Sequence, residues 1–190
     1  MVLPSAYLPP ISWFFPLVKG EPVLIEQYEN YQKQSLRNRC VIDSPNGPLN
    51  LSIPVDRSTF HAGKCLMKDV RISTHSDWQR QHWYALETSY FNSPFFEYLQ
   101  DDFRPFYERH WTFLIDFNEA LIHQCCKLLD LHPHLTRTTS YTGLTPLPTV
   151  NCQLSTVNYY QVFQQKHGFL PNLSIIDLIF NMGNESVLYL

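Results

Sequence analysis

The sequence predicts an α/β or α+β fold, in which a mixed sheet from the N-terminal half is packed by helices of the second half. Short apolar runs bounded by proline and glycine fill roughly the first 75 residues, which is typical of strands. Apolar residues at helical spacing dominate from about residue 77 to residue 131. The 190 residues are 44% hydrophobic and 16% charged, a composition that excludes the disordered class and suits a single domain over residues 1–190.

Five apolar runs in the first half are expected to be strands: residues 2–8, 22–28, 37–43, 49–55 and 69–73. The run at 22–28 has a continuous apolar core, the kind that is buried on both faces. Asn46-Gly47 between the third and fourth runs is a hairpin signal, and Pro54 places the fourth strand at an edge or at its own end. A short helix is expected at 11–18, where Pro16 must end or kink it.

The second half is expected to contain four helices, over residues 77–90, 94 to about 103, 118–131 and 174–181. Ser76 is the N-cap candidate of the first helix, and Asp116 with Glu119 matches the capping-box pattern that would start the third. Ser174 is placed to cap the last helix, and Gly183 follows it where a C-terminal glycine belongs. Between the third and fourth helices lie a β-like segment and a Gly/Pro loop, at residues 136–141 and 142–151.

Composition and missing motifs exclude several classes of protein. A formal charge of −3 and a pI of about 6.2 argue against a generally basic nucleic-acid binder. The sequence contains no P-loop, GxGxxG, HExxH or GxSxG motif. His123 and Cys126 are spaced to share a metal ion on one helix, but the sequence has no second pair of ligands at metal-site spacing. No apolar run reaches the roughly 20 residues of a transmembrane helix. Five cysteines without regular spacing predict free thiols and a cytoplasmic location.

Positive charge is concentrated between Lys33 and Arg80. This segment holds eight basic and four acidic residues, a net charge of +4, and since the whole chain carries −3 the remainder carries −7. Such an asymmetry can steer an anionic ligand to one face of a protein. The alternative is that strand edges and loops carry lysine and arginine for solubility.

The strongest candidate site is the polar run QYENYQKQ at residues 27–34, directly after the second predicted strand. Ligands of open α/β sheets bind beyond the carboxyl ends of strands. Glu26 or Glu29 is expected to act as a general base. Substrate contacts in this region are expected from Tyr28, Tyr31, Lys33, Arg37, Asn38 and Arg39. The alternative is a solvated loop whose tyrosine rings cover the core.

Aromatic residues, 13 Phe, 11 Tyr and 4 Trp in all, are densest between Trp78 and Phe117. Their place in predicted helices favours a role in the core, and the alternative is an aromatic wall for a ringed ligand. His82 lies beside Trp83 and is expected to be partly buried and hydrogen-bonded, with a catalytic acid or base as the alternative.

Two parts of the sequence resemble the WbqC-like protein family. Near the C-terminus, Tyr160-Gln161 is followed at residues 169–183 by FLPNLSIIDLIFNMG, which is similar to the closing signature of that family. The front of the chain agrees in Tyr7-x-Pro9, Tyr31-x-Lys33, Asn38-Arg39-x-x-Ile42 and Leu51-x-Ile53-Pro54-Val55. The chain departs from the family at residues 4–6, where Pro-Ser-Ala stands in place of the usual Gln-Pro-Asn.

The C-terminal block also presents a helix N-terminus. Asn172, Ser174 and Asp177 are expected to contact substrate there, because free N–H groups at a helix start can hold an anion. The alternative is that Ser174 and Asp177 only cap the helix.

The resemblance implies an acyl or aminoacyl (glycine) transferase that acts in O-antigen-type surface polysaccharide biosynthesis. Such an enzyme would take a small-molecule or sugar-linked anionic substrate, and no nucleic acid. The transferase hypothesis predicts that one cleft contains Glu26 or Glu29 together with Arg37, Asn38 and Arg39. Asn172 or Asp177 is expected in the same cleft. The alternative is a non-catalytic binding or assembly protein with an exposed aromatic partner surface. The sequence leaves the cofactor and the oligomeric state open.

Overall fold

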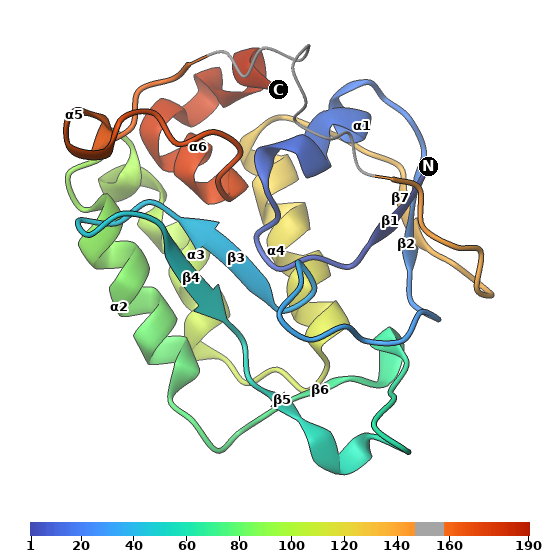
Figure 1. Ribbon diagram of the computed structural model, residues 1–190. Helices are drawn as coiled ribbons and strands as arrows, with labels where there is room; N and C mark the ends of the chain where they lie inside the picture. Colours follow the sequence, from blue (N-terminus) through green and yellow to red (C-terminus); the bar gives the residue numbers. More distant parts are fainter. Residues whose placement is uncertain (147–157) are drawn as a thin grey trace.

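Three short parallel strands form the sheet that leads into the candidate loop. The computed structural model describes residues 1–146 and 158–190. In it β1 (Val2–Pro4), β2 (Val23–Glu26) and β7 (Leu135–Arg137) pair in the order β1-β2-β7 (Figure 1). Ile25 is level with Leu3 on one side and with Arg137 on the other. Because all three strands run in the same direction, the segments that leave their carboxyl ends start at one edge of the sheet.

The remaining strands form two antiparallel pairs. β3 (Arg39–Ile42) pairs with β4 (Leu49–Ser52), which confirms the hairpin predicted from Asn46-Gly47. β5 (Val55–Asp56) pairs with β6 (Arg71–Ile72), and the 3-10 helices η2 (Arg57–Thr59) and η3 (Met67–Asp69) lie between them along the chain. The described strands are therefore divided among three small sheets, where one mixed sheet was expected.

Helices supply most of the regular structure and confirm the predicted α/β or α+β class. They are η1 (Ile11–Phe14), α1 (Phe15–Val18), α2 (Trp78–Tyr90), α3 (Phe96–Glu108), α4 (Leu114–Leu128), α5 (Gln164–His167), α6 (Ile175–Met182) and η4 (Gly183–Tyr189). α2 packs on α3, and α6 packs on both α3 and α4 (Figure 1). No helix in the described part of the chain is long and apolar enough to cross a membrane.

The aromatic block between Trp78 and Phe117 is mostly core. The ring of Phe180 on α6 lies 5.0 Å from Phe96 and 5.4 Å from Phe103, centroid to centroid, so the last helix closes the core against α3. Tyr84, Phe91 and Tyr98 are the exceptions within the block, with exposed fractions of 65–76%. The strand β2 is also less buried than expected, because Leu24 is 36% exposed.

The start of α4 differs from the prediction. The helix begins at Leu114, four residues before the predicted Asn118, and Asp116 does not cap it. Leu114 is fully buried, so the first turn belongs to the core face. Asp116 and Glu119 instead accept hydrogen bonds from Arg137 at the end of β7. A local capping pattern was outweighed by burial and by a partner far away in the sequence.

Four other helix ends test the sequence signals. Ser76 does not cap α2, because Asp77 occupies the N-cap position. Asp77 makes no side-chain cap hydrogen bond there. Pro94 lies before the start of α3, and Pro16 lies in the first turn of α1, where a missing N–H costs nothing. The Oγ of Ser174 accepts from Ile176 N at 3.4 Å, which confirms the predicted cap of α6.

Four cysteines, Cys40, Cys65, Cys125 and Cys126, are free, as predicted, and all four are buried. The fifth, Cys152, lies outside the described residues, as does the end of the predicted loop at 142–151.

Candidate functional site

The loop that follows β2 is fixed to the sheet by Glu26. Its carboxylate is fully buried and accepts hydrogen bonds from Tyr28 N at 2.8 Å, Thr138 Oγ1 at 2.9 Å and Thr142 N at 2.9 Å. Burial raises the pKa of Glu26, but the hydrogen bonds outweigh it and hold that pKa below the ordinary value. This carboxylate therefore joins the ends of β2 and β7, and it lies outside the three hollows described below.

A buried ion pair between Glu29 and Arg37 links the two ends of the loop that follows β2. Arg37 donates from Nε to Glu29 Oε1 at 2.8 Å and from its terminal nitrogen to Glu29 Oε2, and both side chains are 5% exposed. Asn118 of α4 donates to the carbonyl of Arg37 at 2.8 Å, and Tyr31 N donates to the carbonyl of Cys65 at 2.8 Å. The backbone between residues 29 and 37 is thus held at both ends.

A hollow of about 350 Å³ opens between this loop and the start of β5. We call it the basic hollow, because Lys33, Arg39 and Arg57 line it together with Tyr31 and Asn38. No acidic side chain is among the described residues that line it. Cations brought together without counterions create a positive potential that favours an anion.

A second hollow, of about 470 Å³, lies on the other side of Tyr31. We call it the tyrosine hollow, because Tyr28, Tyr31 and Tyr141 line it beside Glu29 and Asn30. Tyr28 is held by Lys68, whose Nζ lies 4.8 Å from the centre of the ring. Tyr141 comes from the segment after β7, so the two loops at the carboxyl edge of the parallel sheet build this hollow together.

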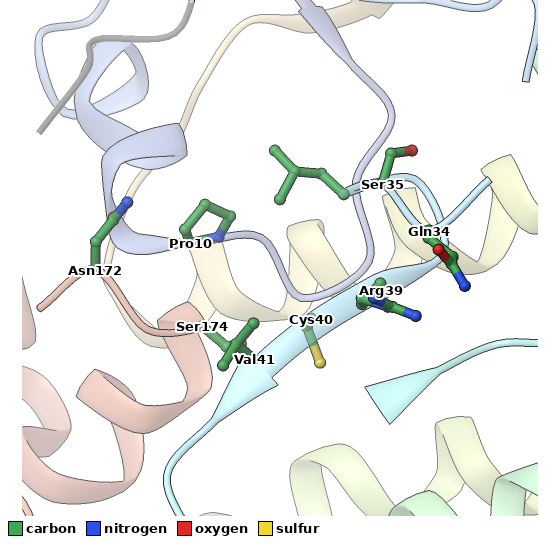
Figure 2. A pocket seen from close by; sticks show the side chains of 9 residues that line it. Pro10, Gln34, Ser35, Arg39, Cys40, Val41, Asn172 and Ser174 are labelled. Atoms are coloured by element: carbon green, nitrogen blue, oxygen red, sulfur yellow. The ribbon is translucent and has the colours of Figure 1, made fainter. Parts of the chain in front are cut away.

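A third hollow, of about 330 Å³, is mostly apolar (Figure 2). Pro10 and Asn172 lie on one side of it, with Gln34 and Arg39 at the opposite end. Gln34 and Arg39 also line the basic hollow, so this apolar hollow adjoins it. Cys40 reaches the wall, but burial raises the pKa of its thiol far above the usual range, which makes it a poor nucleophile.

Asn172 and Ser174 line the apolar hollow with side chains that also hold the backbone. Asn172 has a φ of +55° and accepts from Ser12 N at 2.9 Å. Ser174 donates from Oγ to the carbonyl of Leu8 at 2.7 Å in addition to capping α6. These contacts dock the start of α6 onto the loop that follows β1.

Asp177 lies away from the hollows, deep in the core. It is fully buried and accepts from the hydroxyls of Tyr90 at 2.8 Å and Tyr159 at 2.5 Å, and from Gln161 Nε2 at 3.3 Å. Burial raises its pKa to about 6, and nearby Asp43 adds to that rise against the lowering by the hydrogen bonds.

Most of the residues expected at the site meet along the three hollows. The expected residues that line them are Tyr28, Glu29, Tyr31, Lys33, Asn38, Arg39, Asn172 and Ser174. Glu26, Arg37 and Asp177 lie behind the walls or in the core. Sequence reasoning missed Arg57 and Tyr141. Arg57 was visible only as part of the positively charged segment, and no local signal marked Tyr141.

In the part of the chain that the structure describes, no group of three or more His, Cys, Asp or Glu side chains is arranged to hold a metal.

A comparison with protein families matches residues 5–148 to the WbqC-like protein family. The chain belongs to this family. The match includes the basic and tyrosine hollows, whereas the C-terminal block with Asn172 and Ser174 lies beyond the matched residues. This WbqC-like chain is 26% identical to a Mycobacterium tuberculosis protein named "Uncharacterized protein Rv1507c", over all of this chain and 96% of that protein. No solved structure matches this WbqC-like chain.

Proposed function

We propose that this WbqC-like protein is a transferase that moves an acyl or aminoacyl group, such as glycine, onto a sugar-linked acceptor in O-antigen-type surface polysaccharide biosynthesis. The observation that carries the proposal is the basic hollow, where Lys33, Arg39 and Arg57 converge without an acidic residue in the lining. Activated donors and sugar-linked acceptors of such reactions carry phosphate groups, which guanidinium and ammonium groups bind by charge-assisted hydrogen bonds. The cytoplasmic location predicted from the sequence is part of this proposal.

The loop residues divide the chemistry between them. Glu29 lines the tyrosine hollow and takes the proton from the acceptor hydroxyl or amine, while Arg37 fixes the position of its carboxylate. The new C–O or C–N bond forms as the bond from the donor carbonyl carbon to its leaving group breaks, and the proton passes from Glu29 to that leaving group or to water. Glu26 acts as a positioning residue, because it lines none of the three hollows and its oxygens bind the loop backbone and Thr138.

Tyr31 is suited to stabilise the oxyanion. It lines both the basic and the tyrosine hollow. Burial raises the pKa of Tyr31, although Arg57, Arg37 and Arg39 act in the opposite direction. Its hydroxyl therefore keeps its proton at neutral pH and can donate a hydrogen bond to charge that develops on the carbonyl oxygen.

A ligand screen by thermal shift tests the proposal, with nucleotide sugars, sugar phosphates, aminoacyl donors and acyl carriers. A ligand at 100 times its dissociation constant adds about 2.7 kcal/mol to the free energy of unfolding. Lys33 and Arg57 are exposed, so the double variant Lys33→Ala/Arg57→Ala is expected to fold and to bind a ligand found in this way about 100-fold more weakly. Arg104→Ala on α3, which also removes an exposed arginine, is the matched control and should bind normally.

A donor and acceptor that both bind then allow the reaction itself to be measured. Mass spectrometry is expected to show that the acceptor gains the mass of the acyl group. Glu29→Gln should slow this gain by about 100-fold or more when the acceptor is saturating. If none of the ligands binds, or if the double variant binds as well as the wild type, the proposal is wrong.

The alternative, a non-catalytic binding or assembly protein, is favoured by one observation. Tyr84, Phe91 and Tyr98 on α2, the following turn and α3 are 65–76% exposed. A protein that binds its partner through exposed aromatic side chains such as Phe91 would lose this association on Phe91→Asp and would be unaffected by loss of Lys33 and Arg57. The two functions therefore make opposite predictions for the two sets of variants.

A further inference from the structure

The basic hollow and the tyrosine hollow share Tyr31 as a common wall. Two adjoining hollows of different chemistry can hold two parts of a single ligand. The part in the basic hollow must be anionic, since Lys33, Arg39 and Arg57 face it. The part in the tyrosine hollow is defined by the residues that line that hollow.

The tyrosine hollow offers rings and neutral hydrogen-bonding groups. Tyr28 and Tyr141 provide aromatic surface, and Asn30 and Gln32 provide amides. Glu29 is the single acidic residue among the described lining residues, and its charge is paired with Arg37. A surface of this kind suits a group without net charge that combines a flat C–H face with a rim of hydroxyls.

Tyr141 is the side chain of this hollow best placed for a ligand to cover. It is 65% exposed, whereas Tyr31 is half-buried against Phe60, with ring centroids 5.8 Å apart. A large aromatic ring left in solvent beside a hollow gains apolar contact when a ring of the ligand stacks on it.

We infer that the acceptor is a glycosyl phosphate, with its sugar ring in the tyrosine hollow against Tyr141 and its phosphate in the basic hollow beyond Tyr31. This inference rests on the proposed function and names the substrate of the same site. The sugar ring then lies beside Glu29, where a sugar hydroxyl or amine can lose its proton. The apolar hollow beyond Arg39 is left for the group on the other side of the phosphate, a nucleoside or a lipid.

Isothermal titration calorimetry with a set of matched probes tests this arrangement. The probes are hexose 1-phosphates, the corresponding free hexoses, inorganic phosphate, UDP, UDP-hexoses and a farnesyl diphosphate-linked hexose. A hexose 1-phosphate is expected to bind at least 10-fold more tightly than either the free hexose or phosphate. Tighter binding of a UDP-hexose or of the farnesyl-linked hexose then assigns the nucleoside or the lipid as the group in the apolar hollow.

Matched variants separate the two hollows. Tyr141→Ala is expected to weaken the binding of hexose 1-phosphates by about 5- to 10-fold and to leave inorganic phosphate unchanged. Tyr84→Ala is the control, since Tyr84 is also 65% exposed but lies on α2. Arg57→Ala should weaken both probes.

Three results would overturn the inference. If Tyr141→Ala leaves the binding of hexose 1-phosphates unchanged while Arg57→Ala weakens it, the sugar position is wrong and the proposed function stands. If Tyr141→Ala weakens UDP as much as UDP-hexose, a nucleobase occupies the tyrosine hollow and the inference is wrong. If no phosphate-bearing probe binds, the inference and the proposed function both fail.

Discussion

Two buried clusters each join two tyrosine hydroxyls to one titratable side chain, at opposite ends of β3. In the histidine cluster, Tyr7 OH lies 2.9 Å from His82 Nδ1 and 3.0 Å from Tyr107 OH. In the aspartate cluster, Tyr90 and Tyr159 donate to Asp177. The side chain that binds the other two, here called the hub, is the Tyr7 hydroxyl in the first cluster and the Asp177 carboxylate in the second. Burial favours the neutral forms of both His82 and Asp177. Because histidine is neutral without its extra proton and aspartate is neutral with one, the two groups respond to pH in opposite directions.

The histidine cluster is centred on the hydroxyl of Tyr7. Tyr7 OH lies within hydrogen-bond distance of both His82 Nδ1 and Tyr107 OH, so it links the other two side chains. Burial lowers the pKa of His82 to about 4. The expectation of a buried, hydrogen-bonded histidine is met. This cluster fixes the loop after β1, which carries Tyr7, onto α2 and α3.

The largest effect is expected from removing the carboxylate hub. Asp177→Ala leaves three buried donors, on Tyr90, Tyr159 and Gln161, without their acceptor, which should cost about 4 kcal/mol of unfolding free energy. Urea denaturation at pH 7 measures the loss. Asp101→Ala, an exposed aspartate on α3, is the control and should change stability by about 0.5 kcal/mol or less. A loss below about 1 kcal/mol for Asp177→Ala would show that the carboxylate is not the hub.

Opposite pH responses are the next largest expectation. The pKa of His82 is about 4 when folded and 6.5 when unfolded, so its contribution to stability is present above pH 6.5 and is lost as the pH falls toward 4. The pKa of Asp177 is about 6 when folded and 3.8 when unfolded, so the stabilisation that comes from its bound proton is present below pH 3.8 and is lost as the pH rises through 6. Each amounts to about 2–3 kcal/mol, and in the wild type they largely cancel.

Single variants expose each contribution. Relative to the wild type, His82→Gln is expected to gain about 2–3 kcal/mol of stability as the pH falls from 7 to 4, and Asp177→Asn to lose about as much. Urea denaturation at several pH values measures both slopes. Taking differences from the wild type removes the effect of the other carboxylates. Slopes of the same sign for the two variants would refute the contrast between the clusters.

A smaller effect is expected from one hydroxyl of the aspartate cluster. Tyr159→Phe removes a hydrogen bond to a charged acceptor and should cost about 2 kcal/mol at pH 7. Because that bond lowers the pKa of Asp177, its loss should also move the midpoint of the Asp177 titration upward. NMR of the carboxyl carbon follows this midpoint, and a midpoint that stays in place or falls would contradict the assignment.

Sequence reasoning succeeded where the deciding residues are close together in the chain. Asn46-Gly47 predicted the β3–β4 hairpin, and Ser174 predicted the start of α6, because turns and caps depend on neighbours within a few positions. It failed at the start of α4, where Asp116 and Glu119 bind Arg137 about twenty residues away. Long-range partners of this kind leave no local pattern.

The same distinction applies to the candidate site. The polar run at 27–34 was placed beyond the carboxyl end of a strand, and it lies there. Tyr141 joins it only because β7 pairs with β2, and Arg57 joins only through the turn after β5. The role expected for Asp177 also depended on unseen neighbours, since the buried position of Tyr90 and Tyr159 decides what that carboxylate contacts.

The smallest effect is expected at the end of the histidine cluster. Tyr107→Phe removes one hydrogen bond between neutral groups and leaves Tyr7 bound to His82, so it should cost about 1 kcal/mol. Tyr7→Phe removes the hub and leaves both His82 Nδ1 and Tyr107 OH unpaired, so it should cost at least twice as much. Urea denaturation of the two variants at pH 7 gives the order. Equal losses would mean that Tyr7 is not the hub, and the contrast with Asp177 would then no longer hold.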